Sequence, residues 1–201
     1  MSVTIATLDV QIFTSLRAFL LGVLPSAVEV FRAQINRVPE PMGLNFVVMT
    51  EIGRRRIGTD VETWTTLAAG NPLNAIAVEQ STDVMIQLDV HGPAGADNAQ
   101  IISTLMRNNY GCVLFANAGY GVQPLEADDP KQVPFINGEQ QYEDRWIVIA
   151  RMQANPVVTI GQPFADTLDI NIFDEADGPV TLSGNSLIEP YTDTSGGFFT
   201  S

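Results

Sequence analysis

Residues Tyr142–Val158, YEDRWIVIARMQANPVV, form the longest stretch of the chain that has the pattern of one β-strand with its entry loop. Side chains point alternately to the two faces of a strand. From Trp146 to Ala154 every even position is apolar, whereas the odd positions are Arg145, Ile147, Ile149, Arg151 and Gln153. One face is therefore suited to a core, and the other is apolar only in its middle. We predict the central strand of a sheet that has its core on one side.

The segment before this strand, Val122–Gln141, contains three prolines and no regular spacing of apolar residues. Most connections in a compact domain are shorter than this, and the long ones are often functional. We therefore predict that Val122–Gln141 is a binding loop.

Two segments have the apolar spacing of amphipathic helices. In Thr7–Leu24 the apolar residues recur at steps of three and four, and Pro25 follows as a stop signal. Ala96–Tyr110 has the same spacing, and Gly111 occupies the position where many helices end on a left-handed residue. The sequence therefore predicts two helices.

Further segments are predicted to be strands from their alternation or their β-branched and aromatic content. Ile76–His91 alternates most regularly, and its second face is acidic and polar, so we expect that face to be exposed to water. Asn45–Ile52 and Thr59–Thr65 indicate a hairpin or one bent long strand, since glycines flank the basic segment between them. The other predicted strands are Ala27–Val38, near a sheet edge, and Asp166–Asp174.

The order of these elements, which is helix, several strands, helix and two strands, indicates an α+β fold. In such a fold a mostly antiparallel sheet has helices packed on one face. The last 28 residues, from Asp174, contain five acidic residues, four glycines and no Lys or Arg, so they cannot form a core of their own. We predict one α+β domain, residues 1–173, and an extended acidic C-terminal arm, residues 174–201.

The chain has 10 Lys and Arg against 23 Asp and Glu, which gives a net charge of −13. Proteins that bind the phosphate backbone need a basic surface, so this balance argues against a DNA-binding protein. A surface that DNA slides past without binding would also be acidic. We predict no membrane span or targeting segment, because the apolar run Ala18–Leu24 is only seven residues long. Cys112 is the only cysteine, which favours folding in the cytoplasm.

His91, the one histidine, is the first candidate for chemistry. A histidine with carboxylates can form a metal site or an acid/base pair. The carboxylates considered are Asp89, Asp128, Asp129, Glu143 and Asp144. The chain has no metalloprotease, nucleophile-elbow or phosphate-loop motif. A lone histidine at a strand end is more often a surface or turn residue, so we predict no catalytic residue, no metal and no cofactor.

Arg54, Arg55 and Arg56 are three consecutive cations in an acidic protein. Such a run is either a solvated turn or a docking point for an acidic surface. Asp128 and Asp129 are complementary in charge, although an Asp pair ahead of a proline also initiates turns. A contact between neighbouring copies of the chain would use both sets.

The order and spacing of five unusual strings carry a resemblance to a known family. The strings are INRVPEP (Ile35–Pro41), RRRIGTDVETW (Arg54–Trp64), EQSTDVMIQLDVHGP (Glu79–Pro93), QPLEADDPKQVPFINGEQQYEDRW (Gln123–Trp146) and QANPVVTIGQPFADTLDI (Gln153–Ile170). They resemble the neck or tail terminator proteins of tailed bacteriophages, and the similarity covers most of residues 27–174. The block PFINGEQQYEDRW is the most specific of the matched segments.

The resemblance implies a structural protein of the virion, assembled in the host cytoplasm, that forms a closed ring at the head-proximal end of the tail. The ring is usually a hexamer, with a head-completion or connector protein above it and the tail tube below. Sheath or collar proteins are further neighbours, and DNA passes through the lumen without specific binding. The predicted contact residues are Arg54, Arg55, Arg56, Asp128, Asp129, Phe135, Phe198 and Phe199. We expect the arm after Asp174 to bind an adjacent subunit or ring.

Two other functions stay open at this point. A head–tail connector or stopper of the same neck would share ring assembly and acidic charge. A metal-dependent acidic hydrolase would use His91 with Asp128 or Asp129 and would require a bound metal ion.

Overall fold

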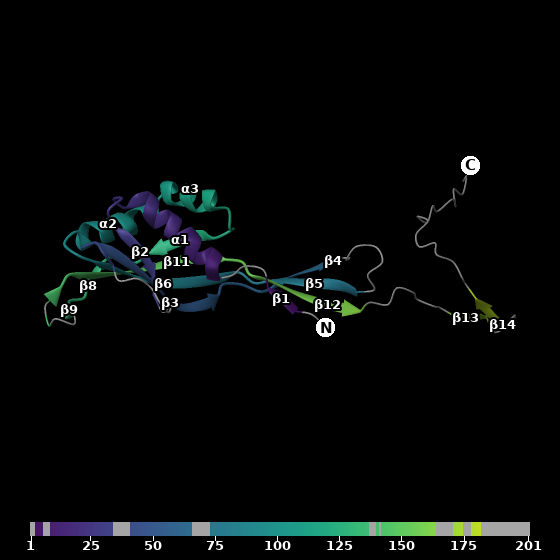
Figure 1. The fold of residues 1–201 in the computed structure, drawn as a ribbon. Coiled ribbons are helices and arrows are strands. Elements are labelled where there is room, and N and C mark those ends of the chain that lie inside the picture. Colours follow the sequence, from purple (N-terminus) through teal and green to yellow (C-terminus); the bar gives the residue numbers. More distant parts are fainter. Residues whose placement is uncertain are drawn as a thin grey trace, which may run out of the picture. The chain divides into compact units, whose positions relative to one another are not determined.

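The chain divides into two compact units, residues 1–163 and residues 164–201. The computed structural model describes residues 3–5, 9–33, 41–65, 73–136, 140, 142–163, 171–174 and 178–181 (Figure 1). Within these residues the first unit contains the helices and the two larger sheets, and the second unit contains one strand pair.

A six-stranded sheet is the centre of the first unit. Its strand order is β2-β3-β6-β11-β7, and the short strand β8 also pairs with β11. These pairs are antiparallel except for β2 with β3, which is parallel. The bounds are Glu29–Arg32 for β2, Phe46–Arg56 for β3, Thr82–His91 for β6, Gln123–Ala127 for β7, Lys131–Gln132 for β8 and Arg145–Ala154 for β11.

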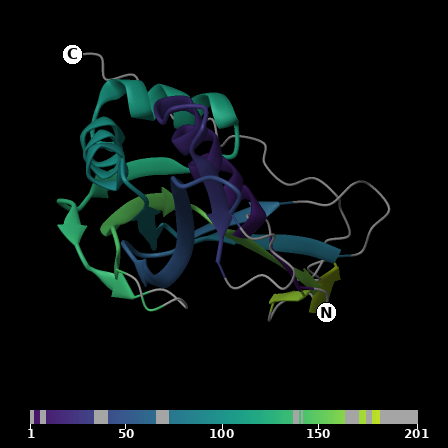
Figure 2. The same cartoon turned by 60° about the vertical axis from the view of Figure 1, so that its left-hand side comes forward.

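Helices cover one face of this sheet (Figure 1, Figure 2). They are α1 (Asp9–Val23), α2 (Gly95–Met106) and α3 (Asn109–Ala118). The even positions of β6 from Val84 to Val90, and of β11 from Val148 to Ala154, are buried in the core together with Phe19 of α1. Burial of a large apolar side chain contributes about 1.5–3 kcal/mol relative to exposure. The predicted α+β fold with helices on one face of a mostly antiparallel sheet is confirmed.

The helix predicted over Ala96–Tyr110 ends earlier, because α2 stops at Met106. A further helix, α3, begins at Asn109 and extends beyond the predicted range to Ala118. Asn108 begins α3, because its side chain accepts a hydrogen bond of 3.0 Å from the backbone N–H two residues later. The prediction that Gly111 ends a helix is wrong. This glycine lies inside α3, where a Cβ atom would come within 2.3 Å of the Leu105 carbonyl oxygen. The left-handed residue that ends α3 is Gly119, with a φ of 75°.

A second sheet of the first unit has four strands in the order β1-β12-β5-β4, all paired antiparallel. The bounds are Val3–Ile5 for β1, Val61–Thr65 for β4, Leu73–Glu79 for β5 and Val157–Pro163 for β12. This sheet extends beyond the layer of helices (Figure 1, Figure 2). On its edge strand β4, 59% of the Trp64 surface is exposed.

Two long antiparallel segments run through both sheets with one register. β5 pairs with β12, and β6 pairs with β11. The register stays the same along both pairs, from residue 73 opposite residue 163 at one end to residue 91 opposite residue 145 at the other. Between the sheets the Gln80 N–H donates to the Pro156 carbonyl at 3.1 Å, so the ladder continues. The predicted strands Ile76–His91 and Tyr142–Val158 each cross from one sheet to the other.

A third long segment, β3 followed by β4, lies alongside this ladder. β3 pairs with β6 in the six-stranded sheet, and β4 pairs with β5 in the four-stranded sheet. Neither interpretation of residues 45–65 holds as stated: β3 and β4 do not pair as a hairpin, and residues 57–60 separate them into two strands of different sheets. A bulge between Glu51 and Gly53 shifts the register of β3 against β6 by one residue. A bulge of this kind bends the strand that contains it.

The binding loop predicted over Val122–Gln141 contains three short strands, β7, β8 and β9. β7 and β8 pair with β11, and β9 (Phe135–Ile136) pairs with β10 (Tyr142–Glu143). Sequence periodicity missed these strands because the prolines keep them short. A proline is tolerated in β7 because that strand lies at the edge of the sheet.

The second unit contains an antiparallel pair, β13 (Asn171–Asp174) with β14 (Gly178–Thr181). The predicted strand Asp166–Asp174 is confirmed over its last four residues, and its earlier part lies outside the described residues. The predicted domain boundary at Asp174 stays a prediction.

We expect removal of residues 164–201 to leave the thermal midpoint of the remaining chain within a few degrees of the full-length value. The physical reason is that the core cluster of the described residues extends from Ile12 to Ala154, within the part that remains. Differential scanning calorimetry of the two proteins measures the shift. Loss of the cooperative transition in the shorter chain would contradict the prediction.

Candidate functional site

The face of the six-stranded sheet opposite the helices carries charged side chains from neighbouring strands. The odd positions of β6 include Asp83 and Asp89, and the odd positions of β11 include Arg145 and Arg151. Only 1% of Asp83 and 7% of Asp89 is exposed. The prediction that this face of the strand is exposed to water is wrong for these two carboxylates, because arginines of the adjacent strand bind them. Met85 and Gln87 on the same face are partly exposed.

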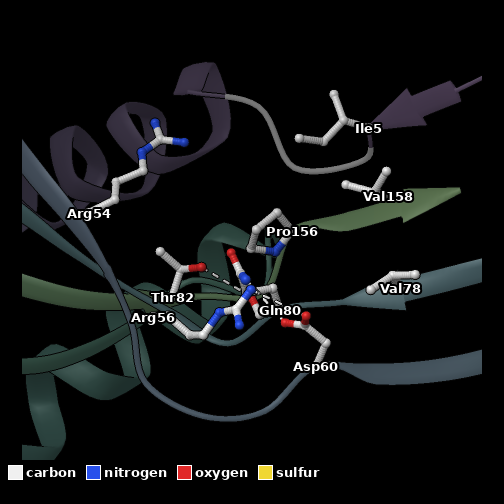
Figure 3. A pocket seen from close by; sticks show the side chains of 9 residues that line it. All are labelled: Ile5, Arg54, Arg56, Asp60, Val78, Gln80, Thr82, Pro156 and Val158. Atoms are coloured by element: carbon white, nitrogen blue, oxygen red, sulfur yellow. Dashed lines mark hydrogen bonds and ion pairs between the residues drawn. The ribbon is translucent and has the colours of Figure 1, made fainter.

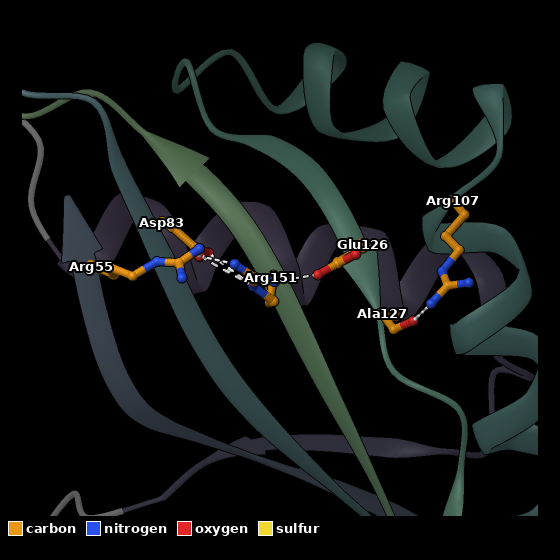
Figure 4. Close-up of polar contacts among 6 residues, drawn as sticks. All are labelled: Arg55, Asp83, Arg107, Glu126, Ala127 and Arg151. Carbon is orange, nitrogen blue, oxygen red and sulfur yellow. Dashed lines mark hydrogen bonds and ion pairs between the residues drawn. The ribbon is translucent and has the colours of Figure 1, made fainter. Parts of the chain in front are cut away.

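Asp83 is the centre of an ion-pair network that joins β3, β6, β7 and β11 (Figure 4). Arg151 donates to its carboxylate from Nε at 3.1 Å and also from Nη2, and Arg55 approaches it at 3.3 Å. Another nitrogen of Arg151 binds Glu126 on β7. The hydrogen bond with Asp83 is the main cause that raises the pKa of Arg151, so its guanidinium stays charged.

A second buried pair lies farther along the same face. Arg145 donates to Asp89 from Nη2 at 2.6 Å and from Nε at 2.9 Å, and Gln87 donates to the same carboxylate at 2.9 Å. Opposite charges at alternate positions of two strands were visible in the sequence. Their pairing was not, because it depends on the register between β6 and β11.

His91 lies at the end of β6, between β3 and β11. Its ring stacks on Phe46 with centroids 4.5 Å apart, and its Nδ1 is 2.9 Å from Oε1 of Glu143. Since only 9% of His91 is exposed, the interpretation as a surface or turn residue is wrong. The burial follows from its place opposite Phe46, which sequence spacing alone does not reveal.

The carboxylates suggested as metal or acid/base partners of His91 do not all gather around it. Glu143 lies beside it. The backbone of Asp128 is hydrogen-bonded to Ile149 of β11, whereas the residue of β11 that pairs with His91 is Arg145. These two positions of β11 are four residues apart, which is about 13 Å at the rise of a strand. Within the described part of the chain, no group of three His, Cys, Asp or Glu side chains is placed to hold a metal ion.

The basic run Arg54–Arg56 forms the end of β3, so the alternative that it lies in a turn is wrong. Arg54 points toward the helices, where it binds Glu51 at 2.7 Å and also binds Asp9 at the start of α1. The hydrogen bond with Glu51 is the main cause that raises the pKa of Arg54. This arginine therefore connects β3 to the helix layer.

The other two arginines of the run have more exposed side chains. Arg55 is 67% exposed beside Asp83, and Arg56 is 58% exposed and lies 3.3 Å from Asp60. The Arg56–Asp60 pair is an exposed one and contributes about 0–1 kcal/mol, so it adds little to folding. The guanidinium groups of Arg55 and Arg56 remain accessible to a partner.

The acidic pair of the sequence prediction follows β7. The N–H of Asp128 donates to the Ile149 carbonyl at 3.0 Å, and its own carbonyl accepts from Ser103 Oγ at 3.1 Å. Arg107, after α2, binds the carbonyl of the preceding residue, Ala127 (Figure 4). The backbone at Asp128 is therefore held in place, while the side chain of Asp129 is exposed.

Across the strand order of the sheet, the structure places the basic run and the acidic pair toward opposite edges. Arg54–Arg56 end β3, Asp128 and Asp129 follow β7, and strands β6 and β11 lie between them. They do not meet within one chain in the described contacts. Phe135 lies on β9, but its side chain, like all of Phe198 and Phe199, falls outside the described residues.

A shallow cavity of about 330 Å³ lies where the two sheets of the first unit meet (Figure 3). Arg54, Arg56 and Asp60 line its polar side. Its apolar side is formed by Ile5, Val78, Pro156 and Val158. Side chains of β1, β5 and β12 and of the connection between β3 and β4 thus border one hollow.

A family model described as phage neck terminator protein matches residues 10–182 of the chain. The chain belongs to this family. Membership makes it a component of the bacteriophage neck and confirms the resemblance inferred from the quoted strings. The match also includes α1 and the β13–β14 pair, which those strings did not cover.

A comparison with curated protein sequences finds no match. Among the described residues, no helix is long and apolar enough to cross a membrane.

We expect Arg151→Met to lower the free energy of unfolding by about 3 kcal/mol. The substitution leaves the buried Asp83 carboxylate with only the exposed Arg55, and loss of one partner of a buried ion pair is strongly destabilising. Urea denaturation measures the change.

The matched control is the double variant Asp83→Leu/Arg151→Met, which should recover most of the loss because no charge stays buried without its partner. A single variant as stable as the parent would show that the network contributes little.

Proposed function

We propose that this chain forms a closed homo-oligomeric ring, a hexamer, in the phage neck. The ring ends the tail tube and joins it to the head-completion or connector proteins, leaving a channel for DNA. The observation that carries the proposal is the family match over residues 10–182. The separation of a basic and an acidic set on opposite sides of one sheet supports it.

The placement of the two charged sets suits contact between copies in a head-to-tail arrangement. When each copy presents a basic side to the acidic side of the next, the contact is heterologous, and a rotation that closes produces a ring. Arg55 and Arg56 are the accessible cations of one side, and Asp129 is the exposed anion of the other. Phe135 and the terminal Phe198 and Phe199 are further proposed contact residues.

The acidic composition supports passage of DNA rather than its retention. Each copy has a net charge of −13, so the summed electrostatic field of a ring repels the phosphate groups of DNA. Arg54, Arg55 and Arg56 each lie beside a carboxylate of their own chain, which reduces their attraction for phosphate. This pairing supports passage of DNA without specific binding.

Electron microscopy of the purified full-length protein, with native mass spectrometry of the same sample, tests the ring. We expect annular particles with the mass of a closed oligomer. In a lysate of phage that lacks the protein, we expect separate heads and tails, with joining restored by the added protein. A monomeric mass in solution and in the virion would overturn the proposal.

We expect Arg56→Glu to weaken ring assembly or head–tail joining about tenfold, the effect of roughly 1.4 kcal/mol at the contact. The thermal midpoint should change by a few degrees at most, because the pair with Asp60 is exposed. Titration of assembly against protein concentration measures the loss.

The charge-swapped variant Arg56→Glu/Asp129→Arg is the matched control, and it should regain part of the assembly lost in the single variant. Normal assembly of Arg56→Glu would exclude the basic run from the contact.

A further inference from the structure

A shallow groove of about 270 Å³ lies between helix α1 and strand β2, at one edge of the six-stranded sheet. Arg17 and Leu21 line the groove from α1, and Val28 and Val30 line it from β2 and the residue before that strand. Val30 is only 6% exposed, whereas Leu21 is 46% exposed. The groove therefore combines buried and accessible apolar side chains, which suits an apolar side chain of a partner.

Strand β2 has one neighbour among the described strands, β3, so its other side is an open edge. The N–H of Ala33, just after β2, donates to the Met49 carbonyl of β3 at 2.9 Å. Backbone groups of successive residues point to opposite sides of a strand, so those of Val30 and Arg32 point away from β3. An extended segment can pair with these groups by adding a strand to the edge.

Arg17 is the charged residue of this groove that is accessible to a partner. It is exposed, and no carboxylate in the described part of the chain forms an ion pair with it. Glu29 also lines the groove, but its carboxylate accepts the N–H groups of Met42 at 3.3 Å and Gly43 at 3.0 Å. The groove therefore favours a segment that has a carboxylate close to an apolar side chain.

The chain itself contains a segment with this chemistry. Residues 182–201, which lie outside the described residues, contain two acidic residues and no Lys or Arg. Leu187 and Glu189 are the only aliphatic residue and carboxylate of this segment that stand two positions apart, so they share a face when the segment is extended. A chain of 20 residues spans up to about 66 Å when extended, which is enough to reach another copy.

We propose that residues 186–189 of an adjacent copy add a strand to the edge of β2, with Leu187 in the groove and Glu189 against Arg17. The inference rests on the proposed ring, because a neighbouring copy supplies the segment, and it names the surface that receives the acidic arm.

The direction of the added strand follows from the arrangement of α1 and β2. The end of α1 leads to the start of β2 through only five residues. Arg32, at the end of β2, packs over the ring of Phe13 near the start of α1, 3.8 Å from the ring centre. The helix and the strand therefore run in opposite directions, and a segment that runs parallel to β2 passes the end of α1 first.

The spacing of the partner side chains agrees with this direction. Arg17 and Leu21 are four residues apart, or about 6 Å along the helix axis. Leu187 and Glu189 are two residues apart, or about 6.6 Å along an extended strand. A segment parallel to β2 therefore brings Leu187 to Leu21 and Glu189 to Arg17. Pro190 follows directly and has no N–H to donate, which suits the end of a short edge strand.

Cross-linking of the full-length protein tests the contact. In a Cys112→Ser background, which removes the only native thiol, Leu21→Cys is combined with Leu187→Cys. Assembled rings are treated with a short thiol-specific cross-linker. We expect a ladder of linked chains up to the size of the ring on a denaturing gel, since each copy carries both halves of the contact.

The matched control combines Leu21→Cys with Ile188→Cys. The side chain of residue 188 points to the opposite face of the proposed strand, so this pair should give at most a weak ladder. An equally strong ladder from both pairs would show that the segment does not lie in the groove as a strand and would overturn the inference.

Charge reversal tests the ion pair in the same cross-linking background. Arg17→Glu should slow the cross-linking of Leu21→Cys with Leu187→Cys about tenfold, because it places a second carboxylate against Glu189. The swapped variant Arg17→Glu/Glu189→Arg should regain most of the rate. An unchanged rate in Arg17→Glu would overturn the inference.

The outcomes separate this contact from the proposed ring. Annular particles that give no ladder from Leu21→Cys with Leu187→Cys would overturn the inference and leave the ring standing. Links found by mass spectrometry only within single chains would overturn it as well, because the segment would then not come from an adjacent copy. Failure of the parent protein to form rings would instead refute the proposed function.

Discussion

The register between β6 and β11 is the constraint on which the rest of the first unit depends. It places Asp83 and Asp89 on one face and the even-numbered apolar residues Val84, Ile86, Leu88 and Val90 on the other. A slip of one residue would turn both carboxylates into the core beneath the helices, where a charge without a partner is very costly. Because β5 and β12 keep the same offset, the pairing that supports the helices also fixes the faces of the four-stranded sheet.

Periodicity predicted the elements that have one apolar face and one polar face, such as α1 and the two long segments of the ladder, β5–β6 and β11–β12. It missed α3 because Gly111 has the properties of a helix end, whereas its actual role is a close approach to the Leu105 carbonyl. It missed β7 and β8 because their hydrogen bonds go to β11, a partner that local spacing cannot identify. The general class of the fold was therefore predictable, and the short edge strands were not.

For the candidate site, the sequence identified the charged sets but not their environment. The run Arg54–Arg56 was visible as a cluster, but its carboxylate partners come from α1, β3, β6 and the segment after β3. The burial of His91 depends on Phe46 and Glu143, which come from two other strands. The separation of Asp128 from the basic run depends on strand order, a property of the whole sheet. The function in the phage neck was inferred from the five matched segments of the sequence, because no single side chain has a chemistry that indicates it.

The bulge between Glu51 and Gly53 has an evolutionary consequence. It shows that β3 accommodates an extra residue while its neighbours keep their faces. The two strands of the central ladder have no such freedom, because one inserted or deleted residue would reverse the faces of one sheet relative to the other. Length differences between related neck proteins are therefore expected in the outer strand and its connection, while the two central segments keep a fixed number of residues.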